Sequence, residues 1–242
     1  MRLTRALDFL YPSSCALCHS SLKNGKALCA RCSLGLPRII PPYCDRCGLP
    51  FDGHLPSEFT CPDCRESPPP FNFAIAPLRA RHEARELIHS FKYNRRLHLY
   101  RDLATLAAEA WHDSRLSGQT NPAWTLIPVP LHPRRQYWRW FNQSQELALA
   151  LGQQLSLPVS NALRRIRHTK RQTLLSRKER LQNLRGAFRL SKDEQKRRNL
   201  AQKPVILVDD VFTTGSTAAE CARVLKDEGG VEKVVVLTVL RG

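Results

Sequence analysis

The sequence predicts an α/β fold with a mostly parallel sheet and helices on both faces, preceded by a small cysteine-rich module. Residues 204–209 (PVILVD) form an apolar run without alternation, which is typical of a central parallel strand covered on both faces. A helical segment and a second apolar run, 234–240, follow it and complete a β-α-β unit. Eight of the nine cysteines lie before residue 65, which indicates a separate N-terminal module.

The chain has 242 residues and a formal net charge of +17, with 38 Lys and Arg against 21 Asp and Glu. This excess favours an anionic partner, although a plain basic surface would give the same count. No run approaches the roughly 18 apolar residues of a membrane span. Residues 1–12 (MRLTRALDFLYP) do not resemble a signal peptide, and we expect them to form a short amphipathic helix. We therefore expect a cytoplasmic protein without a membrane span.

The N-terminal cysteines form four Cys-x-x-Cys pairs, and two such pairs complete a tetrahedral Zn²⁺ site. Disulfides are the alternative, but a protein without a signal peptide belongs to a reducing compartment, which favours metal binding. Pairing in sequence order predicts two structural Zn²⁺ ions, while the sequence leaves interleaved pairing open. In that order the ligands are Cys15, Cys18, Cys29 and Cys32 for one ion, and Cys44, Cys47, Cys61 and Cys64 for the other.

Residues 1–66 constitute the predicted helix and double zinc module, and residues 71–242 the predicted α/β domain, with the proline-rich residues 67–70 between them. The module is rich in Pro and Gly and has few large aliphatic side chains. Bound metal therefore has to supply much of its folding free energy. Four thiolates around one Zn²⁺ leave a charge of about −2 at each site. The basic excess of the chain therefore belongs to the α/β domain.

Apolar periodicity orders the elements of the α/β domain. It predicts helices over 83–96, 99–115, 143–155 and 216–228, and strands over 124–129, 204–209 and 234–240. Lys92 is expected to be a surface residue of the first helix rather than a catalytic one, and Cys221 a small core residue of the last. Ligands of such sheets bind at the carboxyl ends of the strands, where segments 128–135 and 209–217 both lie.

Residues 205–217 (VILVDDVFTTGST) combine a strand, an acidic pair and a turn that opens a helix. Free backbone N–H groups and the helix dipole attract a phosphate at such a turn. The predicted phosphate ligands are Thr213, Thr214, Gly215, Ser216 and Thr217. Asp209 and Asp210 would repel a phosphate at contact distance, so they are predicted to hold sugar hydroxyls of the same ligand. The alternative is a strand-end acidic pair that only caps the helix.

This segment resembles the phosphoribosyl-pyrophosphate signature of type I phosphoribosyltransferases at all thirteen positions. With the cysteine pairs, residues 127–135 (IPVPLHPRR) and residues 139–143 (RWFNQ), the chain resembles the ComF/GntX family over nearly its whole length. The family pattern continues through Arg177, Arg180, Asn183 and Phe188, although Trp140 stands where the family usually has Gly. The resemblance implies a double zinc ribbon joined to a type I phosphoribosyltransferase-like domain. It also implies a link to natural competence, the uptake and use of imported DNA.

The resemblance further implies the roles of individual residues. Asp209 and Asp210 would bind the ribose 2- and 3-hydroxyls, and residues 213–217 the 5-phosphate, with Mg²⁺ accompanying phosphoribosyl pyrophosphate. Residues 128–135 would form the pyrophosphate loop, and residues 167–181 would cover a lid that closes over the substrate. The basic candidates for the pyrophosphate group are Arg134, Arg135, Lys170 and Arg171.

Two functions are consistent with these residues. The first is a phosphoribosyltransferase that works by positioning and by stabilising the leaving pyrophosphate. The second is a non-catalytic protein that keeps the pocket for sensing and binds single-stranded DNA, with other competence proteins as partners. Residues 164–198, with a net charge of +11, and the aromatic residues of segment 137–141 would serve that second function. The complete acidic pair and turn rank the enzyme first, and the sequence does not reveal its acceptor.

Overall fold

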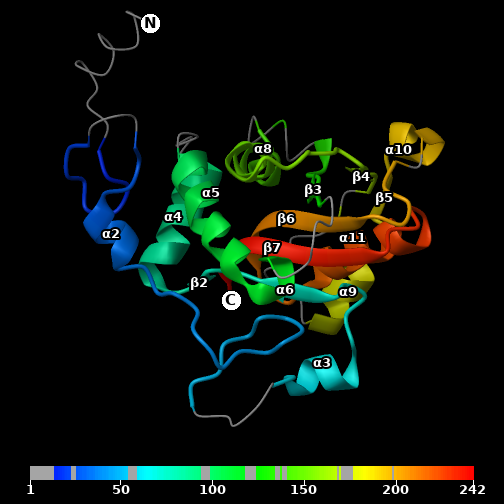
Figure 1. Ribbon diagram of the computed structural model, residues 1–242, viewed down its shortest axis with the longest axis horizontal. Coiled ribbons are helices and arrows are strands. Elements are labelled where there is room, and N and C mark those ends of the chain that lie inside the picture. Colours follow the sequence, from blue (N-terminus) through cyan, green and yellow to red (C-terminus); the bar gives the residue numbers. More distant parts are fainter. Residues whose placement is uncertain are drawn as a thin grey trace, which may run out of the picture.

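A five-stranded sheet forms the centre of the computed structural model (Figure 1). The structure describes residues 14–22, 26–53, 59–93, 99–117, 124–133, 137, 141–167, 169, 177–197 and 199–242. The strands of the sheet are β1 (Phe73–Ile75), β2 (Leu78–Arg79), β3 (Thr125–Pro128), β6 (Pro204–Phe212) and β7 (Lys233–Arg241). Their order is β1-β7-β6-β3, with β2 also beside β7, and every pair is parallel. The predicted parallel sheet is confirmed.

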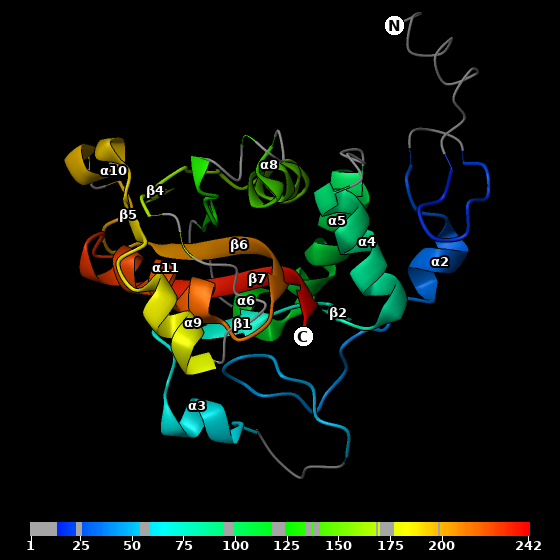
Figure 2. The same ribbon diagram turned by 180° about the vertical axis from the view of Figure 1, so that it is seen from behind.

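Helices cover both faces of the sheet, as predicted. Those of the α/β domain are α4 (His82–Tyr93), α5 (Leu99–Ala108), α6 (Ser114–Ser117), α8 (Gln143–Leu155), α9 (Arg177–Leu184), α10 (Lys192–Arg197) and α11 (Ser216–Asp227). α5 and α8 lie on one face, and α9 and α11 on the other (Figures 1 and 2). An antiparallel pair, β4 (Leu163–Arg165) and β5 (Phe188–Leu190), lies beside α11 and α10. Among the described residues, no helix is long and apolar enough to cross a membrane.

The central strand β6 divides two hydrophobic cores. Ile206 and Val208 point into the core shared with α5 and α8, whereas Val205 and Leu207 point into the core shared with α11. Both sets are buried, which explains why the run does not alternate. Burial of one such aliphatic side chain contributes about 1.5–3 kcal/mol to folding. Cys221 of α11 is fully buried in the second core, as predicted.

One predicted helix is shorter than its periodicity indicated. The segment 99–115 is helical only to Ala108, tightens into a 3₁₀ turn at Glu109–His112, and breaks at Asp113. Asp113 is extended (φ −62°, ψ 123°), and its carboxylate accepts the backbone N–H of Arg115 at 2.9 Å. This local hydrogen bond competes with continuation of the helix and starts α6 instead.

Irregular chain covers both edges of the sheet. On the β2 side, the N–H of Ile39 donates to the carbonyl of Pro77 (2.8 Å), and the N–H of Arg79 donates to that of Pro37 (2.9 Å). On the β3 side, Leu126 donates to the carbonyl of Pro158 (2.8 Å) and accepts from the N–H of Ser160 (2.9 Å). The connection between the two halves of the cysteine-rich segment is therefore part of the sheet's hydrogen bonding.

Candidate functional site

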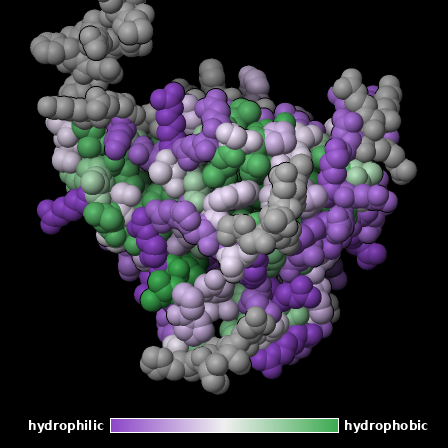
Figure 3. Space-filling model, in the orientation of Figure 1, coloured by the Kyte–Doolittle hydropathy of each residue, from purple (hydrophilic) through white to green (hydrophobic). Residues whose placement is uncertain are grey.

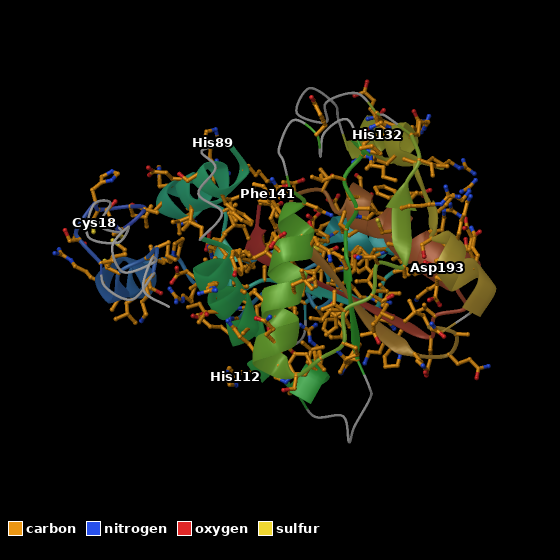
Figure 4. All side chains as sticks on the ribbon, turned by 90° about the horizontal axis from the view of Figure 1, so that it is seen from above. Cys18, His89, His112, His132, Phe141 and Asp193 are labelled. Atoms are coloured by element: carbon orange, nitrogen blue, oxygen red, sulfur yellow. The ribbon has the colours of Figure 1, made fainter. Side chains whose placement is uncertain are left out.

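The first four cysteines form one compact group beside the α5 face. The Sγ atoms of Cys15, Cys18, Cys29 and Cys32 all lie within 4.8 Å of one another. α2 (Ala30–Leu34) begins after Cys29, whose sulfur accepts the N–H of Cys32 at 3.3 Å. The group is attached to the α/β domain by the N–H of Ala27, which donates to Asp102 of α5 at 2.8 Å. Cys18 is exposed, and it lies at the opposite end of the molecule from Asp193 of α10 (Figure 4).

The second four cysteines form another compact group on the opposite side, with the α11 core. The Sγ atoms of Cys44, Cys47, Cys61 and Cys64 also lie within 4.8 Å of one another, and all four residues are buried. α3 (Pro62–Glu66) carries the last of them. Hydrogen bonds fix this group to the sheet and to α6. The N–H of Ala74 in β1 donates to the carbonyl of Arg46 at 2.8 Å, and Arg115 Nη1 donates to that of Asp45 at 2.7 Å.

Both four-cysteine groups fit structural Zn²⁺. Four sulfurs at these separations match the tetrahedral thiolate set that zinc prefers, and the cysteines are free rather than joined in disulfides. In the second group, a hydrogen bond with Cys47 raises the pKa of Cys44 to about 12, and burial raises the pKa of Cys64 to about 12. In the same group, the hydrogen bond with Cys44 lowers the pKa of Cys47. Zinc binding requires the thiols to lose their protons, so it should depend on pH. The cysteines group in sequence order, which decides between the sequential and the interleaved pairing that the sequence left open.

The acidic pair lies at the carboxyl end of β6. Ser144, in the first turn of α8, donates its Oγ hydrogen to Asp209 Oδ1 at 2.8 Å, and the N–H of Asp210 donates to the same oxygen at 2.9 Å. Burial raises the pKa of Asp209 to about 6, and the neighbouring charge of Asp210 adds to the shift. Asp209 therefore titrates close to neutrality, which is unusual for a carboxyl group.

Lys92 forms an ion pair with one member of the acidic pair. Its Nζ lies 2.8 Å from Asp210 Oδ2, and only 21% of its side chain is exposed. The prediction of a surface lysine is wrong, because the fully buried Phe91 holds this end of α4 against the core and turns Lys92 to the strand end. Its place directly after a buried aromatic residue could have indicated that Lys92 is partly buried. Nothing local in the sequence identified Asp210 as its partner.

The turn between β6 and α11 opens a helix at a glycine. Gly215 caps α11 with φ 74° and ψ 3°, in the left-handed region that favours glycine. A Cβ at this position would lie 2.5 Å from the Phe212 ring, so a larger residue would displace the turn. Thr214 Oγ1 and Ser216 Oγ are 2.9 Å apart, and residues 213–217 line one small concavity together with Asp209. The structure therefore brings the predicted residues 209, 210 and 213–217 to one edge.

The other side of the turn faces the second four-cysteine group. A cavity of about 280 Å³ lies between them, lined by Cys47 and Cys61, the proline-rich residues 67–70, and residues 213–215. Arg241, at the end of β7, crosses this region. Its Nε donates to the carbonyl of Cys47 at 2.8 Å, and its Nη1 donates to that of Thr213 at 2.9 Å. No motif in the sequence marks Arg241 as a functional residue.

The predicted pyrophosphate residues Arg134, Arg135, Lys170 and Arg171 lie outside the described residues, as do Arg139 and Trp140. The start of their loop is described. The N–H of Val129 donates to the carbonyl of Val208 at 2.9 Å, and Asn142 Nδ2 donates to that of Val129 at 3.1 Å. The chain after β3 therefore begins beside the acidic pair. The roles of the four basic residues stay predictions.

The described part of the basic segment 164–198 has mixed roles. Arg165 is buried, and its guanidinium lies 5.2 Å from the centroid of the Phe188 ring. Arg167 donates from Nη2 to the carbonyls of Asn183 (2.8 Å) and Arg185 (2.7 Å), which close the end of α9. Both arginines therefore make structural contacts. Hydrophilic residues nevertheless gather over β4, β5 and α10 on the right of Figure 3.

Comparison with known proteins agrees with this organisation. A family model described as a double zinc ribbon domain matches residues 6–65. The chain is 34% identical to Competence protein F of Haemophilus influenzae over 233 residues, which cover 94% of this chain and 96% of that protein. It is 36% identical to DNA utilization protein YhgH of Escherichia coli over 222 residues, covering 90% and 92% of the two chains. Competence protein ComFC of Bacillus subtilis is 25% identical over 238 residues, covering 91% and 86%.

Proposed function

Because this chain belongs to the competence and DNA utilization protein family represented by Competence protein F and YhgH, we propose that it binds phosphoribosyl pyrophosphate in the uptake or use of imported DNA. The observation that carries the proposal is the position of Asp209 and Asp210. They lie in the carboxyl-terminal half of a central parallel strand, which leads through a short turn to a helix capped by a left-handed glycine. Sugar hydroxyls and a phosphate on one ligand match these two chemistries side by side.

Two parts of the ligand, the 5-phosphate and the ribose, would find partners among the described residues of this edge. The free N–H groups and hydroxyls of residues 213–217 would bind the 5-phosphate, and the acidic pair would accept hydrogen bonds from the ribose hydroxyls. Ser144 and Lys92 hold the two carboxylates in place through their contacts with Asp209 and Asp210. Carboxylate and hydroxyl oxygens suit Mg²⁺, which would supply charge neutralisation for the pyrophosphate.

The first candidate activity is phosphoribosyl transfer. An acceptor would form a bond to the anomeric carbon of the ribose as the carbon–oxygen bond to pyrophosphate breaks, and the electron pair leaves with the pyrophosphate. The protein would contribute by positioning both groups and by stabilising the negative charge that develops on the leaving group. Arg134, Arg135, Lys170 and Arg171 are the residues that we assign to that stabilisation.

Binding of single-stranded DNA is the second candidate, and the charge of residues 164–198 favours it. Their net charge is +11, and Arg164 and Arg189 of the β4–β5 pair present side chains at the surface. Each phosphate that such a surface neutralises should add roughly 0.7 to the log–log salt slope for a single strand. Displacement of the strand by excess phosphoribosyl pyrophosphate would indicate a shared site, whereas retention would place the DNA outside the pocket.

Calorimetry with phosphoribosyl pyrophosphate and Mg²⁺ tests the proposal. The double variant Asp209→Asn/Asp210→Asn should fold, because Asn side chains still accept hydrogen bonds, yet lose roughly 100-fold or more in affinity. The control is Asp193→Asn/Asp227→Asn, which removes the same charge at exposed positions. Equal affinity of the wild type and the first variant would contradict the assignment. Release of pyrophosphate on addition of candidate acceptors would separate an enzyme from a binding protein.

A further inference from the structure

Arg241 is a buried cation that contacts no acidic side chain in the described part of the protein. It is 8% exposed, and its partners are backbone oxygens, including that of the adjacent Gly242, one aromatic ring and one sulfur. A buried guanidinium usually pairs with an acidic side chain, since desolvation of an isolated charge is costly. The contacts of Arg241 therefore have to supply that compensation, and they come from two different parts of the molecule.

On one side Arg241 contacts the second four-cysteine group. Its Nε donates to the carbonyl of Cys47 at 2.8 Å, and its Nη2 lies 3.5 Å from the Sγ of the same residue. Four thiolates and one Zn²⁺ carry a net charge of about −2 in the bound state. A guanidinium that donates to one of those sulfurs is a positioning group of the outer shell, and such groups commonly change metal affinity about 10- to 100-fold.

On the other side Arg241 contacts the phosphate turn. Nη1 donates to the carbonyl of Thr213 at 2.9 Å and, more weakly, to that of Phe212 at 3.4 Å. The guanidinium carbon lies 4.8 Å from the centroid of the Phe212 ring. The next residue, Gly242, donates its N–H to the carbonyl of Phe212 at 2.8 Å. The end of β7 thus holds both residues that lead into the turn.

The cavity beside the turn makes this bridge important. About 280 Å³ of space separates residues 67–70 from residues 213–215, although Phe212, which leads into the turn, packs in the same core as the second four cysteines. Across this space the hydrogen bonds of Arg241 form a direct polar link between Cys47 and Thr213. Replacement of the guanidinium by an apolar side chain would leave both carbonyls without this donor, and a lysine would reach one of them but not both.

We propose that Arg241 is a positioning residue that couples the second four-cysteine group to the phosphate turn, so that metal bound at that group orders the turn. The part of the inference that concerns phosphoribosyl pyrophosphate rests on the proposed function. The first four-cysteine group provides the internal contrast. It is attached through Ala27 and Asp102 on the α5 side, away from the turn, so its metal should not order residues 213–217.

The test compares Arg241→Met and Arg241→Lys with Arg223→Met, an arginine of α11 that pairs with Glu220 and Asp227. Three quantities are measured: hydrogen–deuterium exchange of residues 211–219, the rates of zinc release to a chromogenic chelator, and the Kd for phosphoribosyl pyrophosphate with Mg²⁺. Arg241→Met should release one of two zinc ions about tenfold faster. It should also speed exchange in the turn and raise the Kd for phosphoribosyl pyrophosphate about 10- to 100-fold. Arg241→Lys should be intermediate, and Arg223→Met should match the wild type.

Exchange and zinc release require no ligand, so they distinguish the two proposals. If the wild type does not bind phosphoribosyl pyrophosphate but the first two effects appear, the proposed function fails and the coupling stands. Unchanged exchange and unchanged zinc release in Arg241→Met overturn the coupling. If Arg241→Met does not fold, Arg241→Lys and the wild type treated with a chelator test the coupling. In the treated wild type, loss of zinc from the second four-cysteine group must speed exchange in residues 211–219, and loss of zinc from the first group alone must not.

Discussion

The two four-cysteine groups share a ligand set and a spacing but differ in how they join the rest of the protein. The first has an exposed cysteine, Cys18, and an anchoring hydrogen bond from Ala27 to α5. All four cysteines of the second are buried, and the segment around them bonds to β1, to Arg115 and to the end of β7. Both segments also pack apolar residues into a core of the α/β domain, and the second is in addition hydrogen-bonded to the sheet. Similar metal sites can therefore be joined to a domain in different ways.

The largest difference is expected when one ligand is removed from each group. Cys47→Ser should lower the main unfolding temperature by roughly 10 °C or more, because loss of the metal also loosens β1 and β7. Cys18→Ser should also lose one zinc but leave that transition within a few degrees. Calorimetry and metal analysis measure both. Equal shifts in the two variants would contradict the comparison.

A fall in pH should stabilise the α/β domain, to which the second group is joined, through protonation of Asp209. Its pKa is raised to about 6, above its ordinary value of 3.8, so the folded state binds the proton more tightly than the unfolded state. The free energy of unfolding from this group should therefore rise as the pH falls, by about 1–2 kcal/mol between pH 7 and pH 5. Denaturant unfolding checks this, with Asp209→Asn as the variant that lacks the increment.

The affinity for phosphoribosyl pyrophosphate should fall between pH 7 and pH 5, whereas the free energy of unfolding should rise. Protonated Asp209 is a poorer acceptor for ribose hydroxyls, so the Kd should rise as the pH falls through about 6. An affinity that is constant from pH 7 to pH 5, once the titration of the ligand's own phosphates is subtracted, would remove Asp209 from the site.

A smaller and more local difference is expected at two glycines. Gly48 in the second group has φ 65°, and a Cβ there would lie 2.8 Å from the carbonyl oxygen of Ala74. Gly35, after the first group, has φ −74° and room for a Cβ at 3.4 Å from its nearest neighbour. Gly48→Ala should therefore cost about 1–3 kcal/mol of unfolding free energy, and Gly35→Ala about 0.5 or less. Denaturant unfolding of both variants measures the contrast, and similar costs would show that the second group is not pressed against β1.

The smallest expected effect is kinetic. With a chelator in excess, one zinc should leave the wild type about tenfold faster than the other, since exposed ligands such as Cys18 are open to attack. The fast phase should disappear in Cys18→Ser and persist in Cys47→Ser. A single phase that accounts for both ions would mean that the groups are equally accessible.

Local sequence patterns predicted the elements and the metal ligands but not the contacts between distant segments. The run 204–209 and the Cys-x-x-Cys pairs carry their structure in their own spacing, and the strand and the two groups of four cysteines are confirmed. Ser144 reaches Asp209 across 65 residues, and Arg241 reaches Cys47 across 194. Such pairs depend on the packing of whole helices and strands, so no single segment could reveal them. The break at Asp113 was missed because one side-chain hydrogen bond outweighed the helical periodicity.

The covered edges of the sheet have a consequence for any shortened form of the protein. A free strand edge offers unpaired N–H and carbonyl groups to another chain, and this is a common route to aggregation. Here β2 is shielded by residues 37–39, which connect the two four-cysteine groups. Deletion of the cysteine-rich segment would remove this shield together with the metal sites, and the remaining α/β domain would then present an adhesive edge. We therefore expect the shortened domain to aggregate more readily than the full chain.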